Sequence, residues 1–224
     1  MIPIARFIGG GRRFIVEPLG SYTLGSIASG TGTQSSVDIG DPLSNRLIVI
    51  ALGGHRGNTT TQYSAVTING VSATLVAQAH QENGASLANT VIAYAIVPTG
   101  TSVDVGVTVS SANGMSDNHF SVFRLTGYLS STPVHTNTGT GTSSPCSTTL
   151  NVNAGGFLVG VGAVRSGGAN LTWTGLTDYS AENAGSGTME TAYLANQPSE
   201  TSKSISFSDG SGTVARALSV ASWR

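Results

Sequence analysis

The sequence predicts an all-β protein, folded as an antiparallel, jelly-roll-like β-sandwich, and three observations predict this class. From residue 47 onward, short runs of β-branched and aromatic residues are separated by Gly, Asn and Pro, a pattern typical of strands joined by turns. No window has an amphipathic helical period, and the many Gly and Thr residues disfavour helix. The order of strand-like runs in the first half also recurs in the second half, which indicates an internal repeat.

The first runs after residue 47 predict a central strand and a hairpin. Residues 47–52 are almost continuously apolar and end at a Gly-Gly pair, as expected for a strand inside a sheet. Residues 64–68 and 73–77 flank Asn69 and Gly70, the strongest signal for a tight hairpin turn in the chain. We therefore expect these two strands to pair.

Three further runs complete the first half. Residues 90–97 alternate around Tyr94 and end at a Pro-Thr-Gly turn. Valine occupies every second position of residues 103–109, which predicts a half-buried strand with one apolar face. Residues 120–125 are partly apolar on both faces, so we expect this strand to be central in its sheet.

The internal repeat relates residues 45–128 to residues 155–224. Tyr94 and Tyr193, each followed closely by a proline, occupy corresponding places in the two halves. Each half offers only four or five strands, which is marginal for independent stability, whereas two facing sheets can bury one shared core. We therefore expect residues 18–224 to form a single β-sandwich domain.

The stretch of residues 130–147 is rich in Thr, Gly and Ser. In a single sandwich this stretch would be the crossover between the halves. The alternative is two tandem small β-domains, for which the same stretch would be a solvated linker.

The N-terminal residues 1–17 stand apart from the repeat. Apolar residues precede a triple glycine at residues 9–11, and two arginines follow it; the glycines predict a flexible joint. The segment is either the first strand of the domain preceded by a loose tail, or an assembly arm that lies on a neighbouring subunit. The residues expected to make contacts in an arm are Ile2, Ile4, Arg6, Phe7, Ile8, Arg12 and Arg13.

The composition is poor in charge. Charged residues are 9% of the chain and the formal net charge is −1, so little charge repulsion opposes self-association. We expect a homo-oligomer or a place in a fixed assembly. The even balance of charge indicates no nucleic-acid partner, and no run approaches the roughly 20 apolar residues that span a bilayer, so no membrane partner is expected.

No motif in the chain indicates catalysis. A single cysteine, Cys146, excludes an internal disulfide framework and a Cys-based zinc site, and we expect it to be a loop thiol. The sequence has no Gly-x-Ser-x-Gly elbow, and its acidic pairs lie in turn-like contexts. We expect no catalytic residue, no cofactor and no metal ion, and therefore a protein that is not an enzyme. The histidines are scattered rather than closely spaced: His55, His80, His119 and His135.

A weaker indication concerns sugar binding. Trp173 and Tyr179 follow the strand predicted at Phe157, and Asn170 lies nearby to bind hydroxyl groups. These three residues are candidate glycan contacts. The alternative is that Trp173 packs under a loop and Tyr179 fills a sheet edge.

The runs described above resemble a known family of modules. Residues 45–50, 66–76 and 122–127, together with Tyr94 and the turn at residues 98–100, are similar to a β-sandwich module of tailed-bacteriophage structural proteins and of some bacterial surface proteins. The resemblance covers roughly residues 40–224 and brings no catalytic motif that could be carried over. It implies a role in surfaces and assembly.

The resemblance implies a structural protein of a bacteriophage virion, assembled in the host cytoplasm. We expect a capsid decoration or cement protein whose partners are other virion proteins, the major capsid protein or tail subunits. The alternative is a tail- or fibre-associated receptor-binding module that contacts a host-surface glycan.

Overall fold

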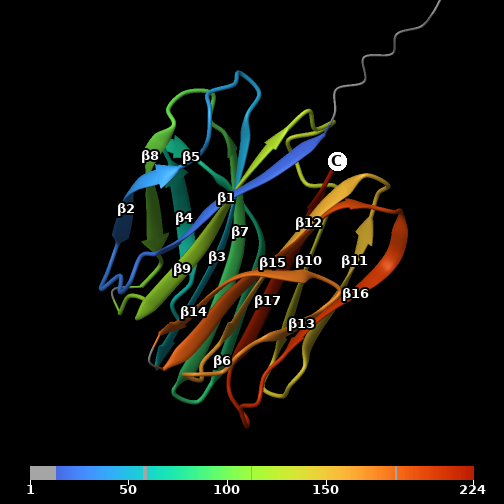
Figure 1. Cartoon of the computed structure of the whole chain (residues 1–224). Helices are drawn as coiled ribbons and strands as arrows, with labels where there is room; N and C mark the ends of the chain where they lie inside the picture. Colours follow the sequence, from blue (N-terminus) through green and yellow to red (C-terminus); the bar gives the residue numbers. More distant parts are fainter. Residues whose placement is uncertain (1–13, 58–59, 112, 185) are drawn as a thin grey trace, which may run out of the picture.

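The computed structural model describes residues 14–57, 60–111, 113–184 and 186–224. These residues form an all-β, antiparallel structure without helix, as the sequence predicts (Figure 1). Within the same residues no helix is present that could cross a lipid bilayer.

The first half of the chain, from residue 15 to residue 126, is a β-sandwich of two antiparallel sheets. One sheet has the strand order β1-β9-β3-β7-β6, and the other has the order β2-β8-β4-β5. The strands are β1 (Ile15–Thr23), β2 (Thr31–Asp38), β3 (Leu47–Gly57), β4 (Tyr63–Ile68), β5 (Val71–Ser72), β6 (Thr74–Asn83), β7 (Ser86–Ile96), β8 (Ser102–Val109) and β9 (Asp117–Thr126).

The second half is a β-sandwich of the same kind. Its sheets have the orders β10-β17-β12-β15-β14 and β11-β16-β13. The strands are β10 (His135–Gly141), β11 (Cys146–Val152), β12 (Gly156–Val164), β13 (Thr172–Thr174), β14 (Thr177–Ala184), β15 (Gly187–Gln197), β16 (Glu200–Ser208) and β17 (Arg216–Trp223).

The strand orders confirm the internal repeat and extend it. The two five-stranded sheets have equivalent strands at each position of their strand orders: β1 corresponds to β10, β9 to β17, β3 to β12, β7 to β15 and β6 to β14. The repeat therefore covers residues 15–126 and 135–223, and begins earlier in each half than the sequence indicated. The expected crossover at residues 130–147 is wrong, because it contains β10 and the start of β11. β10 is an edge strand with mostly exposed Thr and Asn side chains, a composition that resembles a linker.

The predicted turn at Asn69 and Gly70 is confirmed, since both residues have positive φ angles. The expected pairing of residues 64–68 with residues 73–77 is wrong, because these strands lie in different sheets. Only β5 pairs with β4, and the chain then crosses to the other sheet, where β6 pairs with β7.

The sequence predicts a single core shared by two facing sheets, and the observed arrangement of layers differs from this prediction. Each half has a core of its own between its two sheets, and the two five-stranded sheets stack against each other through a third apolar layer. The two halves lie side by side in Figure 1. The reason is visible in β3, where Ile48 and Ile50 enter the core of the first sandwich, while Leu47 and Val49 enter the layer between the sandwiches.

The core of the second sandwich is filled in a different way from that of the first. At the positions of β12 that correspond to Ile50 and Leu52 of β3 stand Gly160 and Gly162. A Cβ atom at Gly160 would lie 2.6 Å from Leu176 Cδ1 and 3.2 Å from Trp173 Cζ3, and one at Gly162 would lie 2.8 Å from Phe207 Cδ1. Large side chains from the facing sheet and its loops thus occupy the space that β3 fills itself.

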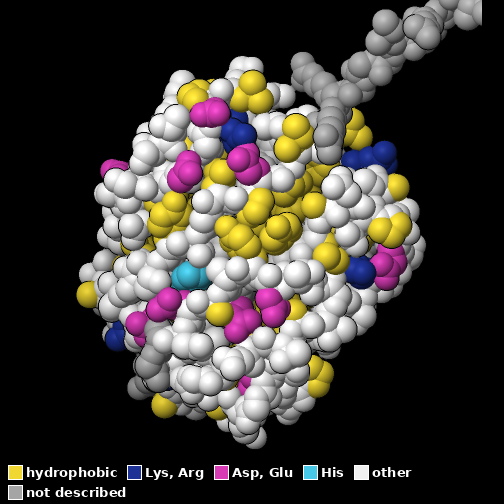
Figure 2. Space-filling view, in the orientation of Figure 1, with side chains coloured by type: hydrophobic (Ala, Val, Ile, Leu, Met, Phe, Trp, Pro, Cys, Tyr) yellow, Lys and Arg dark blue, Asp and Glu magenta, His cyan; other side chains and the backbone are white. Residues whose placement is uncertain are grey.

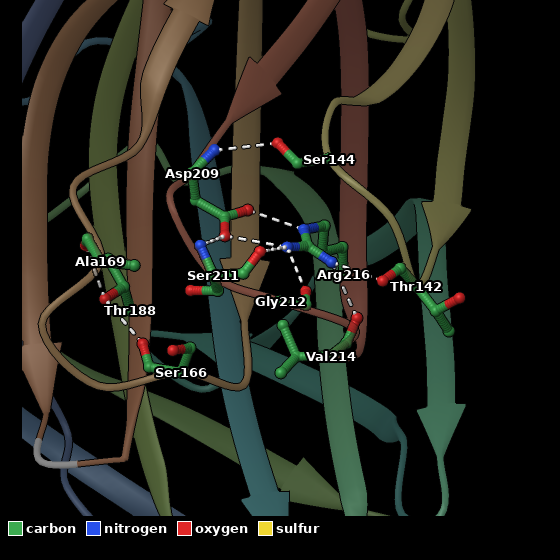
Figure 3. Close-up of polar contacts among 10 residues, drawn as sticks. All are labelled: Thr142, Ser144, Ser166, Ala169, Thr188, Asp209, Ser211, Gly212, Val214 and Arg216. Carbon is green, nitrogen blue, oxygen red and sulfur yellow. Dashed lines mark hydrogen bonds and ion pairs between the residues drawn. The ribbon is translucent and has the colours of Figure 1, made fainter.

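A buried ion pair closes one end of the second sandwich (Figure 3). The side chains of Asp209 and Arg216 are fully buried, with Arg216 Nε 2.7 Å and Nη2 2.9 Å from the two carboxylate oxygens. Arg216 also donates to the backbone carbonyl oxygens of Thr142, Ser211, Gly212 and Val214. The pair therefore ties the β16–β17 loop to the β10–β11 loop.

Candidate functional site

The arm residues predicted from the sequence lie outside the described residues. They are Ile2, Ile4, Arg6, Phe7, Ile8, Arg12 and Arg13. The described chain begins at Phe14 and enters β1 at Ile15, which pairs with Thr126 of β9. Residues 15–17 therefore belong to the first strand of the domain.

The packing between the sandwiches follows an approximate two-fold pattern. β17 packs against β7 and β6, and the equivalent strand β9 packs against β15 and β14; β12 packs on β3 at the centre. One pair of equivalent strand contacts departs from this two-fold pattern. β10 packs closely against β6, but the equivalent strands β1 and β14 make at most marginal contact, so the interface is closed along one side and open along the other.

The open side exposes an apolar surface, which we call the β1–β14 face. It consists of Phe14, Val16, Tyr179 and Tyr193, all half-buried, with Phe123 buried beneath them. Ring centroids of Phe123 lie 5.3 Å from Tyr179 and 5.4 Å from Tyr193. Figure 2 shows a large hydrophobic area in the region where β1, β12 and β15 meet in Figure 1.

Two adjoining hollows lie at the end of the β1–β14 face where the described chain begins. One, of about 200 Å³, is lined by Phe14, Ile15, Val16, Ala195 and Asn196. The other, of about 300 Å³, is lined by Phe14, Gly127, Leu129, Ala154, Gly155, Asn196 and Arg224. The strongly exposed Leu129 adds to the apolar surface at this end.

A polar cluster borders the β1–β14 face between the two sandwiches. The Ser180 hydroxyl lies 2.8 Å from that of Ser121, 2.9 Å from that of Thr191 and 3.1 Å from His119 Nε2. Ser121 and Thr191 are 2.6 Å apart. These hydrogen bonds join β9 of the first sandwich to β14 and β15 of the second. No local pattern in the sequence indicates this cluster, because its members come from three strands.

The cluster contains a serine beside a histidine, the first two parts of a nucleophilic triad. In the described part of the chain, His119 Nδ1 is buried without a hydrogen-bond partner, so no carboxylate orients the imidazole. The Ser180 hydroxyl is shared among three neighbours. This geometry fits a hydrogen-bonded seam that holds the sandwiches in register.

His119 makes the stability of this seam depend on pH. Burial lowers the pKa of His119 from its ordinary value of 6.5, although the nearby Glu182 acts to raise it. The unfolded chain therefore binds a proton first as pH falls, and the contribution of His119 to stability is complete above pH 6.5 and decreases toward the lower folded-state pKa. We expect H119Q to flatten the pH dependence of the unfolding free energy in this window, measured by urea titration. An unchanged dependence would contradict this assignment.

The three candidate glycan contacts are only partly brought together. Asn170 and Tyr179 line a shallow pocket of about 340 Å³, together with Leu171, Asp178, Ser180, Ala181 and Glu190. Trp173 does not line it; its ring packs 5.7 Å from that of Phe207 in the core. Trp173 therefore lies in the core as part of strand β13 and not under a loop, while Tyr179 lies in the edge strand β14, as the alternative expected.

Glu190 is the most buried acid of this pocket, and no motif in the sequence indicates it. Its carboxylate accepts a hydrogen bond from the backbone N–H of Leu171 at 2.9 Å. Burial raises the pKa of Glu190, and the Leu171 hydrogen bond opposes that rise. A carboxyl group in this setting could accept or donate hydrogen bonds to a ligand hydroxyl.

Cys146 is the first residue of β11 and is buried, so the expectation of a loop thiol is wrong. Burial raises the pKa of Cys146 to about 12, which leaves the thiol protonated and unreactive at neutral pH. Within residues 14–224, apart from the gaps named above, no three His, Cys, Asp or Glu side chains gather where they could hold a metal ion.

The chain has little similarity to known proteins. No protein-family model matches the chain, and no curated protein matches it. Among solved structures it is similar to an anti-sigma factor domain-containing protein, at 6% identity over 91% of this chain and 86% of that chain, with a TM-score of 0.24. It is also similar to an anti-sigma factor domain-containing protein from Clostridium clariflavum, at 9% identity over 89% and 85%, with a TM-score of 0.22. Likenesses this weak carry no argument about function.

Proposed function

We propose that the protein is a structural component of a bacteriophage virion, a capsid decoration or cement protein joined to its particle through the N-terminal segment. The observation that carries the proposal is the β1–β14 face. An apolar surface of this kind marks an interaction site, and the described chain begins at its edge with Phe14.

The interior of the protein supports a structural role. Its buried polar groups are used to fix the fold: Arg216 and Asp209 tie two loops together, and Ser121, Ser180 and Thr191 join the sandwiches. A charge-poor body of two stacked sandwiches suits a subunit held in a fixed assembly. The resemblance of residues 40–224 to phage structural modules adds to this support.

The second candidate is a tail- or fibre-associated module that binds a host-surface glycan. It is favoured by the shallow pocket that brings Asn170 and Tyr179 beside the carboxyl groups of Asp178 and Glu190. Protein carboxylates and amides commonly bind sugar hydroxyl groups, and a tyrosine can contribute apolar contact.

Copy number in purified particles distinguishes the two candidates. A decoration protein is expected in many copies on the head, and a tail module in few copies together with binding on a glycan array. Deletion of residues 1–11 should leave a folded, soluble protein that no longer joins the particle. K203A, at a half-buried site in β16 that is remote in sequence from residues 1–11, is the control and should assemble normally. Unchanged occupancy of the truncated protein would refute the arm, and absence of the protein from particles would refute both candidates.

A further inference from the structure

We propose that the pocket beside β14 binds the protonated amino group of a small ligand, with the carboxylates of Glu190 and Asp178 as its counter-ions. The second candidate function uses the same pocket but needs only sugar hydroxyl groups there. The inference does not depend on the place of the protein in a particle, because a head subunit and a tail module can equally hold such a ligand. It rests on the geometry of the pocket, on two incompletely bonded polar groups at its base, and on charge.

The pocket lies between an edge strand and a loop. Residues 178–181 of β14 line it together with Asn170 and Leu171 of the β12–β13 loop and with Glu190 of β15. Asn170 and Asp178 are exposed, whereas Glu190 is only 5% exposed, so Glu190 lies at the base. The volume of about 340 Å³ is within the roughly 300–1,000 Å³ of pockets that bind small molecules.

The strand register turns both carboxylates to the same face of the sheet. In the β14–β15 ladder, Asp178 lies opposite Ala192, and Ala181 lies opposite Glu190. Residues opposite each other in an antiparallel pair point to the same face, and alternate residues of one strand share a face. Ala192 belongs to the core of the second sandwich. Asp178 and Glu190 therefore both lie on the side of β14 and β15 that faces this core.

Glu190 is a nearly buried acid without a counter-ion. Within the described part of the chain, neither Glu190 nor Asp178 forms an ion pair. Arg165, at the start of the β12–β13 loop, donates instead to the backbone carbonyl oxygen of Ser186. Burial raises the pKa of Glu190, and the charge of Asp178 raises it further. A cation in the pocket would offset both effects, because a nearby positive charge stabilises an ionised carboxylate.

The indole N–H of Trp173 is the second incompletely bonded group at the base. Trp173 is 9% exposed, and its Nε1 has no partner at full hydrogen-bonding distance among the described residues. It nevertheless lies close enough to the Glu190 carboxylate to lower the pKa of Glu190. Buried polar groups are normally hydrogen-bonded. The base of the pocket is therefore incomplete, as expected of a site that a ligand fills.

Charge and size select an organic cation. Figure 2 shows acidic side chains, and no Lys or Arg side chain, in the region between the β13 and β14 labels of Figure 1. A calcium ion takes roughly six to eight oxygen ligands, and no three acidic, His or Cys side chains of the described chain gather to hold a metal ion. A protonated primary amine instead carries three N–H donors, which the two carboxylates and the Asn170 amide oxygen can accept.

Titration of ¹⁵N-labelled protein with glucosamine near neutral pH, followed by NMR, tests the proposal. We expect saturable shifts at millimolar concentrations in the amide signals of Asn170, Leu171 and Ala181, and none in that of Val134, near β10. Glucose, which has a hydroxyl group in place of the amine, is the matched ligand and should leave these signals unchanged. Equal shifts with glucose would overturn the ammonium site and leave the second candidate function standing.

Putrescine distinguishes the sources of the amine, because it carries amino groups without a sugar ring. Binding of glucosamine alone would identify the ligand as an amino sugar. Binding of putrescine, with or without glucosamine, would show that an alkylamine is sufficient. Absence of binding by both amines would refute the proposal.

E190Q removes the charge at the base and keeps the size of the side chain. It is expected to weaken the binding of the amine by about tenfold, through loss of a charge-assisted hydrogen bond. E182Q is the matched control, since Glu182 lies opposite Met189, which packs between the sandwiches. Because Glu182 points away from the pocket and solvent ions screen its charge, E182Q should change affinity by less than about twofold.

D178N is the second variant, to be used if circular dichroism shows that E190Q is not folded. Asp178 is exposed, so this substitution should leave the fold intact and weaken binding of the amine by several times more than E182Q does. Equal affinities in the native protein and in the folded variants would refute the pocket as the site. Equal weakening by E182Q would also overturn it, because the attraction would then come from the general charge of the surface.

Discussion

Replacing Arg216 with methionine is expected to lower the free energy of unfolding by about 3–5 kcal/mol, because Asp209 would be left as a buried charge without a partner. Both side chains are fully inaccessible, and the pair is bidentate. Urea titration followed by circular dichroism measures the loss. K203M, which removes the more exposed ion pair with Glu200, is the control and should cost at most about 1 kcal/mol.

The double variant D209L/R216M refines this expectation. Removing both charges relieves the buried carboxylate, so the double variant should be more stable than R216M alone. It should not reach the native value, since four carbonyl oxygens that accept hydrogen bonds from Arg216 lose their donor. Native stability in R216M would show that the ion pair does not hold this end of the sandwich.

The same pair predicts a response to acid. Burial alone would raise the pKa of Asp209, but hydrogen bonds from Arg216 and Ser211 outweigh burial and lower it. The stabilising contribution is therefore present above the unfolded-state pKa of about 3.9 and is lost as pH falls through the lower folded-state value. The difference in stability between the native protein and R216M should shrink over that range.

Replacing Trp173 with alanine is expected to cost about 3–5 kcal/mol, the usual range for an aromatic side chain removed from a core. The ring fills the space above Gly160 and packs on Phe207. G160V should cost about 1–3 kcal/mol in the native background, because its side chain would meet Leu176 and Trp173. In combination the two substitutions should cost clearly less than their sum, since the valine enters the space that the indole leaves.

The matched control for the combination of G160V and W173A is a substitution on the opposite face of the same sheet. Trp223 lies in the layer between the sandwiches, so G160V and W223A should be additive within about 0.5 kcal/mol. Additivity of G160V with W173A would contradict the assignment of Trp173 as the side chain that compensates for glycine.

Much of the fold could be predicted because each strand has a recognisable pattern in its own local sequence. The apolar run at residues 47–52 and the alternating valines at residues 103–109 are strands β3 and β8. The run at residues 47–52 is apolar on both faces, and this pattern indicates burial on both sides but does not say what covers each side. A second sandwich, rather than the opposite half-sheet of one sandwich, covers the outer face. Polar edge strands such as β10 were missed, since one neighbour and a solvent-exposed face place little demand on composition.

The site was harder to predict than the strands. Asn170 and Tyr179 are near in sequence and do line one pocket. His119, Ser121 and Ser180 meet only because two sheets stack, and a sequence carries no local sign of such a meeting. Nor does the sequence distinguish a buried arginine, such as Arg216 bound to Asp209 or Arg46 bound to backbone carbonyls, from an exposed one.

The two-fold pattern between the sandwiches makes the chain comparable to a dimer whose subunits have been fused. The halves are joined by the short connection at residues 127–134, so dilution cannot separate them, and their sequences are free to diverge. Ile50 in one half and Gly160 in the other are one result of that freedom. A homodimer of either half would present two equivalent sides, both open or both closed. This chain has one closed side and one open side, so the two sides of its surface are not equivalent.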